Sequence, residues 1–180
     1  MQIETARLSL RKLREDDAEA LARIFSDPSV VLYSGGQSPS LDEVRDGIRQ
    51  HITEYYATRG YGLFAAELRD TGTIVGRIGF LATEIDESAD AELHYHLSPS
   101  AWGSGLATEA TRAVLAWGFE NGRLGHIVAA IHPDNHASRR VAEKCGLTFW
   151  KEMELHDSGV FQIYEARSPA ASTPPHSLAE

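Results

Sequence analysis

The sequence predicts an α/β protein: a mixed, mostly antiparallel twisted sheet of about seven strands, flanked by four helices. Three observations support this prediction. At 180 residues the chain is long enough to bury one hydrophobic core. Segments with a period of two alternate along it with segments of helical spacing. Apolar residues make up 42% of the chain and charged residues 24%, which is typical of globular proteins.

Each predicted element depends on a local pattern. Strands are expected where apolar and polar residues alternate, or where a short apolar run ends at turn residues. Helices are expected where apolar residues recur every three or four positions, and the pairs Asp16–Glu19 and Ser40–Glu43 resemble capping boxes at two helix starts. In chain order, the patterns predict a strand over 7–13, helices over 18–25 and 41–55, strands over 62–67, 74–80 and 91–97, a helix over 107–120, a strand over 127–131, a helix over 138–144 ended by Gly146, and strands over 149–155 and 160–166.

Composition and charge limit the function classes. We expect one domain over residues 1–167 and a disordered tail over 168–180, which holds three of the seven prolines. The net charge of -9 argues against a nucleic-acid surface, and no run approaches ~18 apolar residues, so no membrane partner is expected. The only cysteine, Cys145, cannot form an internal disulfide, which favours a reducing, cytoplasmic location.

The segment from Leu97 to Ala110 is the most informative, because a predicted strand enters a glycine-rich turn that opens a helix. Free N–H groups and the positive dipole end at a helix start bind phosphate well, and Gly103 and Gly105 let the backbone approach an anion closely. A nucleotide P-loop is excluded because its Gly-Lys-Ser/Thr ending is absent, and a dinucleotide fingerprint is disfavoured by Thr108. Taken alone, the turn is equally compatible with a loop that merely requires two small residues.

A second segment, residues 132–147, contains Asn135 and Ser138 at the start of a short predicted helix. Taken alone, both residues are interpreted most simply as helix caps.

Together the two segments closely resemble the GNAT N-acetyltransferase superfamily. The first reads Gly-Ser-Gly-Leu-Ala-Thr-Glu-Ala over 103–110, and the second reads Asn-x-Ala-Ser-x-Arg-Val-x-Glu-Lys-x-Gly over 135–146. Within the superfamily the chain is similar to the RimJ/RimL-like, ribosomal-protein-alanine branch. The resemblance extends from Thr5 to about Arg167 and implies a sheet that splays after the strand over 91–97, opening a cleft for acetyl-CoA.

The resemblance also implies which residues bind acetyl-CoA. Gly103, Ser104, Gly105, Leu106 and Ala107 fill the pyrophosphate-binding turn. Trp102 stands where many members have Arg or Gln, although an aromatic residue is usual in this branch. Leu97 matches the strand residue whose backbone bonds the pantetheine arm, and its N–H or that of a neighbour would polarise the thioester carbonyl.

On the short helix, Asn135 matches the residue that contacts the pantetheine or the acceptor, and Ser138 matches a residue near the thioester sulfur. Arg140 on the same helix is a candidate to bind the 3′-phosphate of the coenzyme, and a solvated helix face is the equal alternative. Many members carry a Tyr seven residues after the Asn as general acid for the leaving thiolate, but here that position is Ala142. Ser138 is therefore the nearest candidate donor to the sulfur.

The chemistry of amine acetylation requires a proton acceptor. An alkyl amine has a pKa near ~10.4 and an α-amine near ~8, so the attacking amine must lose a proton. Glu92, on the strand that leads into the glycine turn, is the candidate base. The alternative is a structural carboxylate that pairs with a neighbour, and His94 on the same strand face is a second candidate.

Other chemistry-bearing residues carry weaker hypotheses. His94, His96, His132 and His136 do not form a convincing metal site, because no carboxylate or cysteine spacing supports one, so no metal is expected. Cys145 is interpreted as a small core residue. Tyrosines that could line an acceptor pocket, with core packing as the stronger alternative, are Tyr33, Tyr55 and Tyr56.

The sequence thus predicts an acetyltransferase that moves an acetyl group from acetyl-CoA to a primary amine by direct attack. The amine would belong to a protein N-terminus or a small molecule, and the enzyme would be a monomer or a homodimer. Two alternatives stay open: a non-catalytic acyl-CoA-binding sensor or scaffold, and a nucleotide-dependent enzyme with a Rossmann-like turn.

Overall fold

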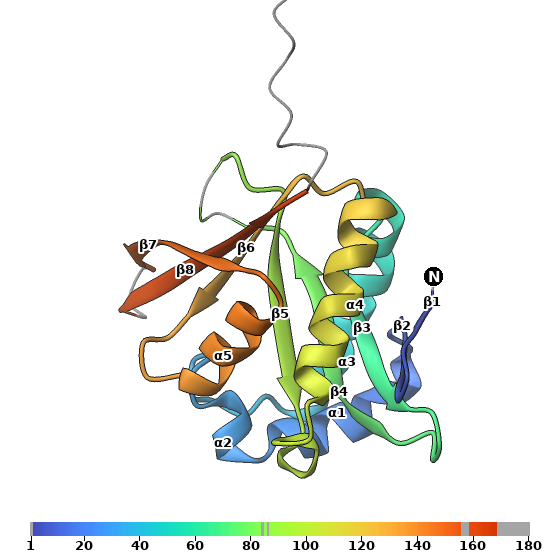
Figure 1. Cartoon of the computed structure of the whole chain (residues 1–180). Coiled ribbons are helices and arrows are strands. Elements are labelled where there is room, and N and C mark those ends of the chain that lie inside the picture. The colour runs from blue at the N-terminus through green and yellow to red at the C-terminus, as the bar shows by residue number, and fades with distance from the viewer. Residues whose placement is uncertain (1, 84, 86, 156–158, 169–180) are drawn as a thin grey trace, which may run out of the picture.

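A computed structural model describes residues 2–83, 85, 87–155 and 159–168. Apart from Ser168, the predicted tail over 168–180 therefore lies outside the described residues. One eight-stranded sheet has the strand order β1-β2-β3-β4-β5-β6-β8-β7 (Figure 1), and only the β5–β6 pair is parallel. The elements are β1 Gln2–Glu4, β2 Leu8–Lys12, α1 Ala18–Phe25, α2 Pro28–Val31, α3 Leu41–Gln50, a π-helix His51–Arg59, β3 Leu63–Leu68, β4 Ile74–Leu81, β5 Ala91–Leu97, α4 Leu106–Glu120, β6 His126–Ile131, α5 His136–Lys144, β7 Thr148–Glu154 and β8 Val160–Arg167.

Helices cover the two faces of the sheet (Figure 1). On one face, α4 packs over the largest apolar cluster, which includes Phe64, Phe80 and Leu97. On the other face, α1, α2 and α3 bury a second cluster around Leu21 and Phe25. This arrangement follows from the sequence, because period-two strands present one apolar side to each helical layer.

The predicted fold class is confirmed, with two additions in the described part of the chain. Strand β1 pairs with β2, and the four-residue helix α2 follows α1. Both segments are too short for their periodicity to be detected in the sequence. The local chemistry of α2 is nonetheless clear: the Asp27 side chain caps it by accepting a hydrogen bond from the Ser29 N–H, and Pro28 occupies its first turn.

Of the two predicted capping boxes, one is confirmed and one is wrong. Ser40 and Glu43 cap α3 reciprocally. Ahead of α1 it is Asp17, not Asp16, that acts: its carboxylate accepts the Arg14 backbone N–H at 2.8 Å and pairs with both terminal nitrogens of Arg11. The prediction failed because a 3₁₀ turn, Glu15–Asp17, precedes α1: Asp17 closes the capping box of that turn, and no side chain caps α1 itself.

Strands β5 and β6 diverge shortly after they meet. Their parallel pairing is limited to Ala91 with Ile127 and Glu92 with Val128, while β5 continues to Leu97 along β4. The expected splay of the sheet is therefore present, and it begins directly after Glu92. No helix in the described ranges is long and apolar enough to cross a membrane.

Candidate active site

The turn between β5 and α4 is held open by its glycines. Gly103 and Gly105 have φ values of +70° and +83°, which L side chains rarely adopt. A Cβ at Gly103 would meet no atom within 4 Å, and one at Gly105 would meet only Arg7 Nη2 at 3.6 Å. The glycines thus serve the backbone conformation and leave free space outside the turn.

Helix α4 begins at this turn without a side-chain cap. Its first internal hydrogen bond runs from Glu109 N–H to the Gly105 carbonyl at 3.0 Å. The N–H groups of Leu106, Ala107 and Thr108 therefore precede the helical ladder and point out of its end. This set of free donors at a positive dipole end can hold a phosphate group.

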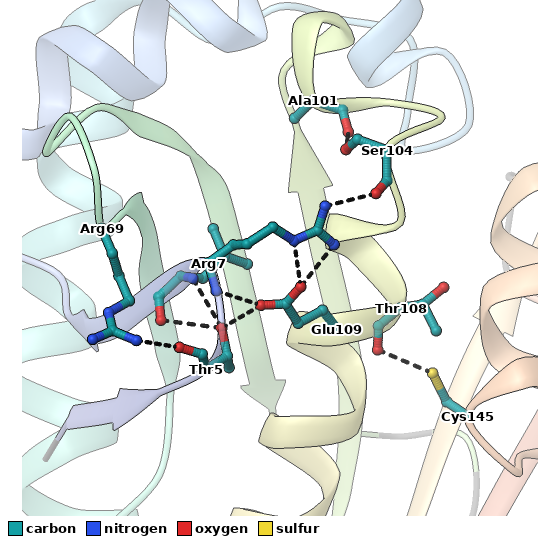
Figure 2. Close-up of polar contacts among 9 residues, drawn as sticks. Thr5, Arg7, Arg69, Ala101, Ser104, Thr108, Glu109 and Cys145 are labelled. Carbon is teal, nitrogen blue, oxygen red and sulfur yellow. Dashed lines mark hydrogen bonds and ion pairs between the residues drawn. The ribbon is translucent and has the colours of Figure 1, made fainter.

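A polar network fixes the turn to the N-terminal segment (Figure 2). The Arg7 guanidinium donates to the Ser104 carbonyl at 2.9 Å and pairs with the Glu109 carboxylate at 2.7 Å. Glu109 also accepts the Thr5 hydroxyl at 2.7 Å and the Arg7 backbone N–H at 2.8 Å. Burial raises the pKa of Glu109, but hydrogen bonds from Thr5 and Arg7 outweigh it and hold that pKa below its ordinary value. Glu109 is thus anchored as an anion in the first turn of α4.

A basic groove of about 720 Å³ opens beside the turn. Three of its side chains are cationic, and Arg112 donates to the Lys144 carbonyl at 2.8 Å, which joins α4 to α5. Such a surface suits a phosphorylated ligand that extends from the turn. The groove is lined by Thr5, Ala6, Arg7, Gly105, Thr108, Glu109, Arg112, Ala113 and Lys144.

The backbone of β5 faces the opening between β5 and β6. Ser98 N–H donates to the Val75 carbonyl at 2.7 Å. Because antiparallel pairing alternates, the N–H groups of Tyr95 and Leu97 are turned away from β4, toward the side that β6 has left. The Leu97 carbonyl accepts the Trp102 indole N–H at 2.8 Å, so half-exposed Trp102 closes the turn onto the strand.

Glu92 lies at the mouth of the splay and is paired with His94. The His94 Nε2 atom is 3.0 Å from Glu92 Oε1. The side chain of His94 is 33% exposed and that of Glu92 is 16% exposed, so the imidazole is the more accessible member of the pair. In this pair the carboxylate can orient the imidazole, and carboxylate–imidazole pairs of this kind recur as proton acceptors in enzymes.

The helix α5 presents a different set of groups on the opposite sheet face. Asn135 Oδ1 accepts the Ser138 backbone N–H at 3.0 Å, so Asn135 is the N-cap and Ser138 is not. The Ser138 hydroxyl lies beside that of Tyr95, which is buried and makes no well-aligned hydrogen bond. Burial raises the pKa of Tyr95 to about 12. Glu92 and Ser138 therefore approach the opening from opposite faces.

The remaining predicted site residues are placed as follows. Arg140 is exposed on α5, one turn before Lys144. Tyr33 lies at the opening, where its hydroxyl donates to the Asp134 carbonyl at 3.3 Å. Tyr55 and Tyr56 are not at the opening: Tyr55 stacks on His51, and the Tyr56 hydroxyl bonds the backbone of Leu13 and Leu63.

The acidic and basic residues around the turn were not predicted individually from the sequence. Arg7 and Glu109 are 102 positions apart, and only the fold brings them together. Arg112 and Lys144 were not predicted as site residues either. Cys145 is half-buried, with its thiol 3.5 Å from the Thr108 carbonyl (Figure 2), and burial raises its pKa. No metal-ligating group of three or more side chains occurs among the residues that the structure describes.

Known proteins share these sequence and structural features. A family model described as an acetyltransferase (GNAT) domain matches residues 7–148. YoaA of Bacillus subtilis, described as an uncharacterized N-acetyltransferase, is 33% identical over 176 residues, which cover 92% of this chain and 97% of YoaA. A solved acetyltransferase from Agrobacterium tumefaciens is 26% identical with a TM-score of 0.78, and the match covers 93% and 95% of the two chains.

RimL, the ribosomal L7/L12 alpha-N-protein acetyltransferase solved in complex with coenzyme A, has a TM-score of 0.79 at 22% identity, over 94% of this chain and 99% of RimL. That likeness concerns the fold. The family-model match and the identity to YoaA, together with the glycine turn and the splayed sheet, assign this chain: it belongs to the GNAT acetyltransferase family and is a GNAT-type N-acetyltransferase.

Proposed function

We propose that the chain transfers an acetyl group from acetyl-CoA to a primary amine by direct nucleophilic attack, in the opening between β5 and β6. The proposal is carried by the splay between β5 and β6, which has the free amides of Leu106, Ala107 and Thr108 at the end of the β5–α4 turn, the N–H groups of Tyr95 and Leu97 along β5, and the Glu92–His94 pair where the strands part. We place this activity in one domain over residues 1–167 of a cytoplasmic protein.

The residues present fit the coenzyme. The first-turn amides of α4, with open space outside Gly103 and Gly105, suit the pyrophosphate. The basic groove at Arg7, Arg112 and Lys144 suits the 3′-phosphate of the coenzyme. Arg140 lies one turn before Lys144 on α5. RimL, a structural neighbour whose solved complex contains coenzyme A, supports coenzyme A as the ligand.

When bound, acetyl-CoA supplies an acetyl group activated as a thioester. The Tyr95 and Leu97 N–H groups face the opening and donate to the thioester oxygen, where negative charge develops. The fixed β4–β5 ladder orients these donors before the reaction. The Leu97 carbonyl stays occupied by Trp102, which keeps the end of the strand in place.

The Glu92–His94 pair accepts the proton of the attacking amine, directly or through water. The imidazole is the exposed member, and the carboxylate at 3.0 Å stabilises it when it becomes protonated. This assignment keeps Glu92 in the site and adds His94 as the group that meets the amine.

On the other face of the sheet, the hydroxyl groups of Ser138 and Tyr95 are available to the departing sulfur. Together they can act as the proton or hydrogen-bond donor that many family members supply from a Tyr at the position of Ala142. Ser138 is free for this role because Asn135 already caps the helix. A buried tyrosine with a pKa of about 12 stays protonated and can donate a hydrogen bond.

A non-catalytic acyl-CoA-binding module is the second candidate function. It requires the turn and the groove, but it gives no reason for an imidazole and a carboxylate paired at the point where the strands part. The two functions are separated by the release of free thiol from acetyl-CoA with a panel of amines and peptides. Acetyl transfer predicts amine-dependent thiol release that Gly105→Val abolishes, and a sensor predicts binding of acetyl-CoA without any release.

A further inference from the structure

Arg77 lies on the same face of the sheet as Glu92 and His94, on the neighbouring strand β4. It is on the central strand β4, opposite His96 of β5, so both side chains share the face covered by α1 and α2. The guanidinium carbon lies 4.5 Å from the centroid of the Phe25 ring, and the His96 ring meets the same Phe25 ring edge-on at 5.5 Å. Packing against the Phe25 ring orients the guanidinium.

This guanidinium has no partner among the described residues. Within the described ranges, no carboxylate lies within 4.0 Å of it and none of its three nitrogens makes a hydrogen bond. Only Nε is completely shielded from solvent. The two terminal nitrogens, which are equally unpartnered, are therefore the open part of the side chain. A buried cation without a counter-charge is costly, and the cost falls when an anion binds to it.

The described titratable side chains near Arg77, His96 and His51, do not supply negative charge. Burial lowers the pKa of Arg77 to about 10. Burial, Arg77 and His94 together lower the pKa of His96 to about 3, so His96 is neutral at physiological pH. Its Nε2 is bonded to Ser34 Oγ at 3.0 Å, while its Nδ1 is buried and unpartnered. His51, also buried, bonds the Gly47 carbonyl through Nδ1, and burial lowers its pKa.

The distance from Arg77 to the proton acceptor is short along the sheet. His96, His94 and Glu92 are alternate residues of β5 and share one face, with neighbours ~6–7 Å apart. A ligand bound at the terminal nitrogens of Arg77 can thus place a second functional group near His94. The planar fork of an arginine matches a carboxylate with two parallel hydrogen bonds.

We propose that Arg77 forms the anion subsite of the acceptor pocket, and that the acceptor is an amine that also carries a carboxylate. Arg77 binds the carboxylate on its terminal nitrogens while the amine is directed toward His94. The inference depends on the proposed acetyl transfer and narrows its substrate class. Free amino acids and peptides with an acidic residue beside the N-terminus both present this chemistry.

Paired acceptors test the subsite in the wild-type enzyme. Each amino acid is compared with its carboxamide, and each N-terminal Ala-Asp peptide with its Ala-Asn counterpart, after correction for the fraction of neutral amine. We expect kcat/KM to be about 10- to 100-fold higher for the carboxylate member, as for a hydrogen-bonded charge pair. Preference within the amino-acid pairs identifies a free amino acid as the source, and preference within the peptide pairs identifies a protein N-terminus. Acetylation of both members at equal rates overturns the subsite and leaves acetyl transfer standing.

The variant Arg77→Met should remove this preference, because kcat/KM falls more for the carboxylate member of each pair than for the carboxamide, while acetyl-CoA affinity, measured by calorimetry, stays unchanged. Arg77→Lys keeps the positive charge but cannot form two parallel hydrogen bonds to a carboxylate, so it should retain part of the preference for the carboxylate member. Arg59→Met is the matched control, because Arg59 also lies over an aromatic ring, Tyr55, but far from the opening. A preference that survives in Arg77→Met refutes the proposal.

Binding is measured independently of turnover with sodium propionate as the probe. At constant ionic strength, propionate in place of chloride should raise the melting temperature of the wild type and of Arg59→Met, because the anion binds only the folded state. Arg77→Met should show no rise. Equal melting temperatures of the wild type in propionate and in chloride contradict the subsite, whatever the activity assay shows.

Discussion

Replacing Gly105 with alanine tests the proposed coenzyme turn, because its effects on folding and on binding can be calculated separately. Gly105 has φ +83°, a conformation that costs an L residue about 1–2 kcal/mol. The new Cβ meets only Arg7 Nη2, at 3.6 Å, which is an ordinary contact and adds no clash. For a chain of this size, ~1 kcal/mol lowers the melting temperature by roughly 2–4 °C. We therefore expect a folded variant that melts about 2–8 °C lower.

Gly60→Ala provides the matched control. Gly60 ends the π-helix with φ +74° and has no atom within 4 Å of its Cβ position, so an alanine there meets similar backbone strain and, as at Gly105, no steric clash. Only Gly105→Ala places a methyl group against the free amides of α4. Loss of one or two charge-assisted hydrogen bonds corresponds to an affinity loss of about 10- to 100-fold or more.

The assay is calorimetric titration of both variants with acetyl-CoA, together with thermal melting. Both should lose similar stability, and only Gly105→Ala should lose affinity. If the two variants bind acetyl-CoA equally well, the coenzyme does not lie against this turn.

Three further predictions concern the opening between β5 and β6. Glu92→Gln should lower kcat/KM by ~10²–10⁴ near neutral pH, with partial recovery at high pH where the amine is already neutral; a loss that does not depend on pH would make Glu92 a structural residue. Ser138→Ala should lower kcat with little change in acetyl-CoA affinity and, since Asn135 is the cap, with little change in melting temperature; unchanged kcat would exclude a role at the sulfur. His96→Gln should reduce the loss of unfolding free energy at acid pH. The pKa of His96 is about 3 in the folded state and ~6.5 in the unfolded state, so its contribution to wild-type stability is complete above pH ~6.5 and falls by about 1.4 kcal/mol per pH unit below it. Denaturant titrations that give the same pH dependence for the wild type and the variant would contradict this.

Much of the architecture was predictable because its elements have long, regular patterns. The strands over 91–97 and 160–166 and the helix over 107–120 agree with β5, β8 and α4 to within one residue. The short elements β1 and α2 were missed because three or four residues cannot display a period.

The site was predictable only where its chemistry is local in sequence. The glycine turn and the Asn135 cap depend on adjacent residues, and the structure shows both conformations. The partners of the titratable groups depend on the fold instead. Nothing near Arg7 indicates Glu109, and nothing near Arg77 indicates that it lacks a counter-charge. Alternation did place Glu92 and His94 on one face, but only the structure shows that β6 separates from β5 directly after Glu92 while it stays paired with β8.

The most direct measurement follows the acetyl group itself. Acetyl-CoA labelled in its acetyl group is mixed with the wild-type protein and an acetylatable amine, and the label is counted in the protein and in the small-molecule fraction over time. Direct transfer predicts that label enters the amine at the rate at which free thiol forms, with none retained on the protein. Label that accumulates on the protein would contradict direct attack, and tight binding without transfer to any amine would contradict the proposed activity.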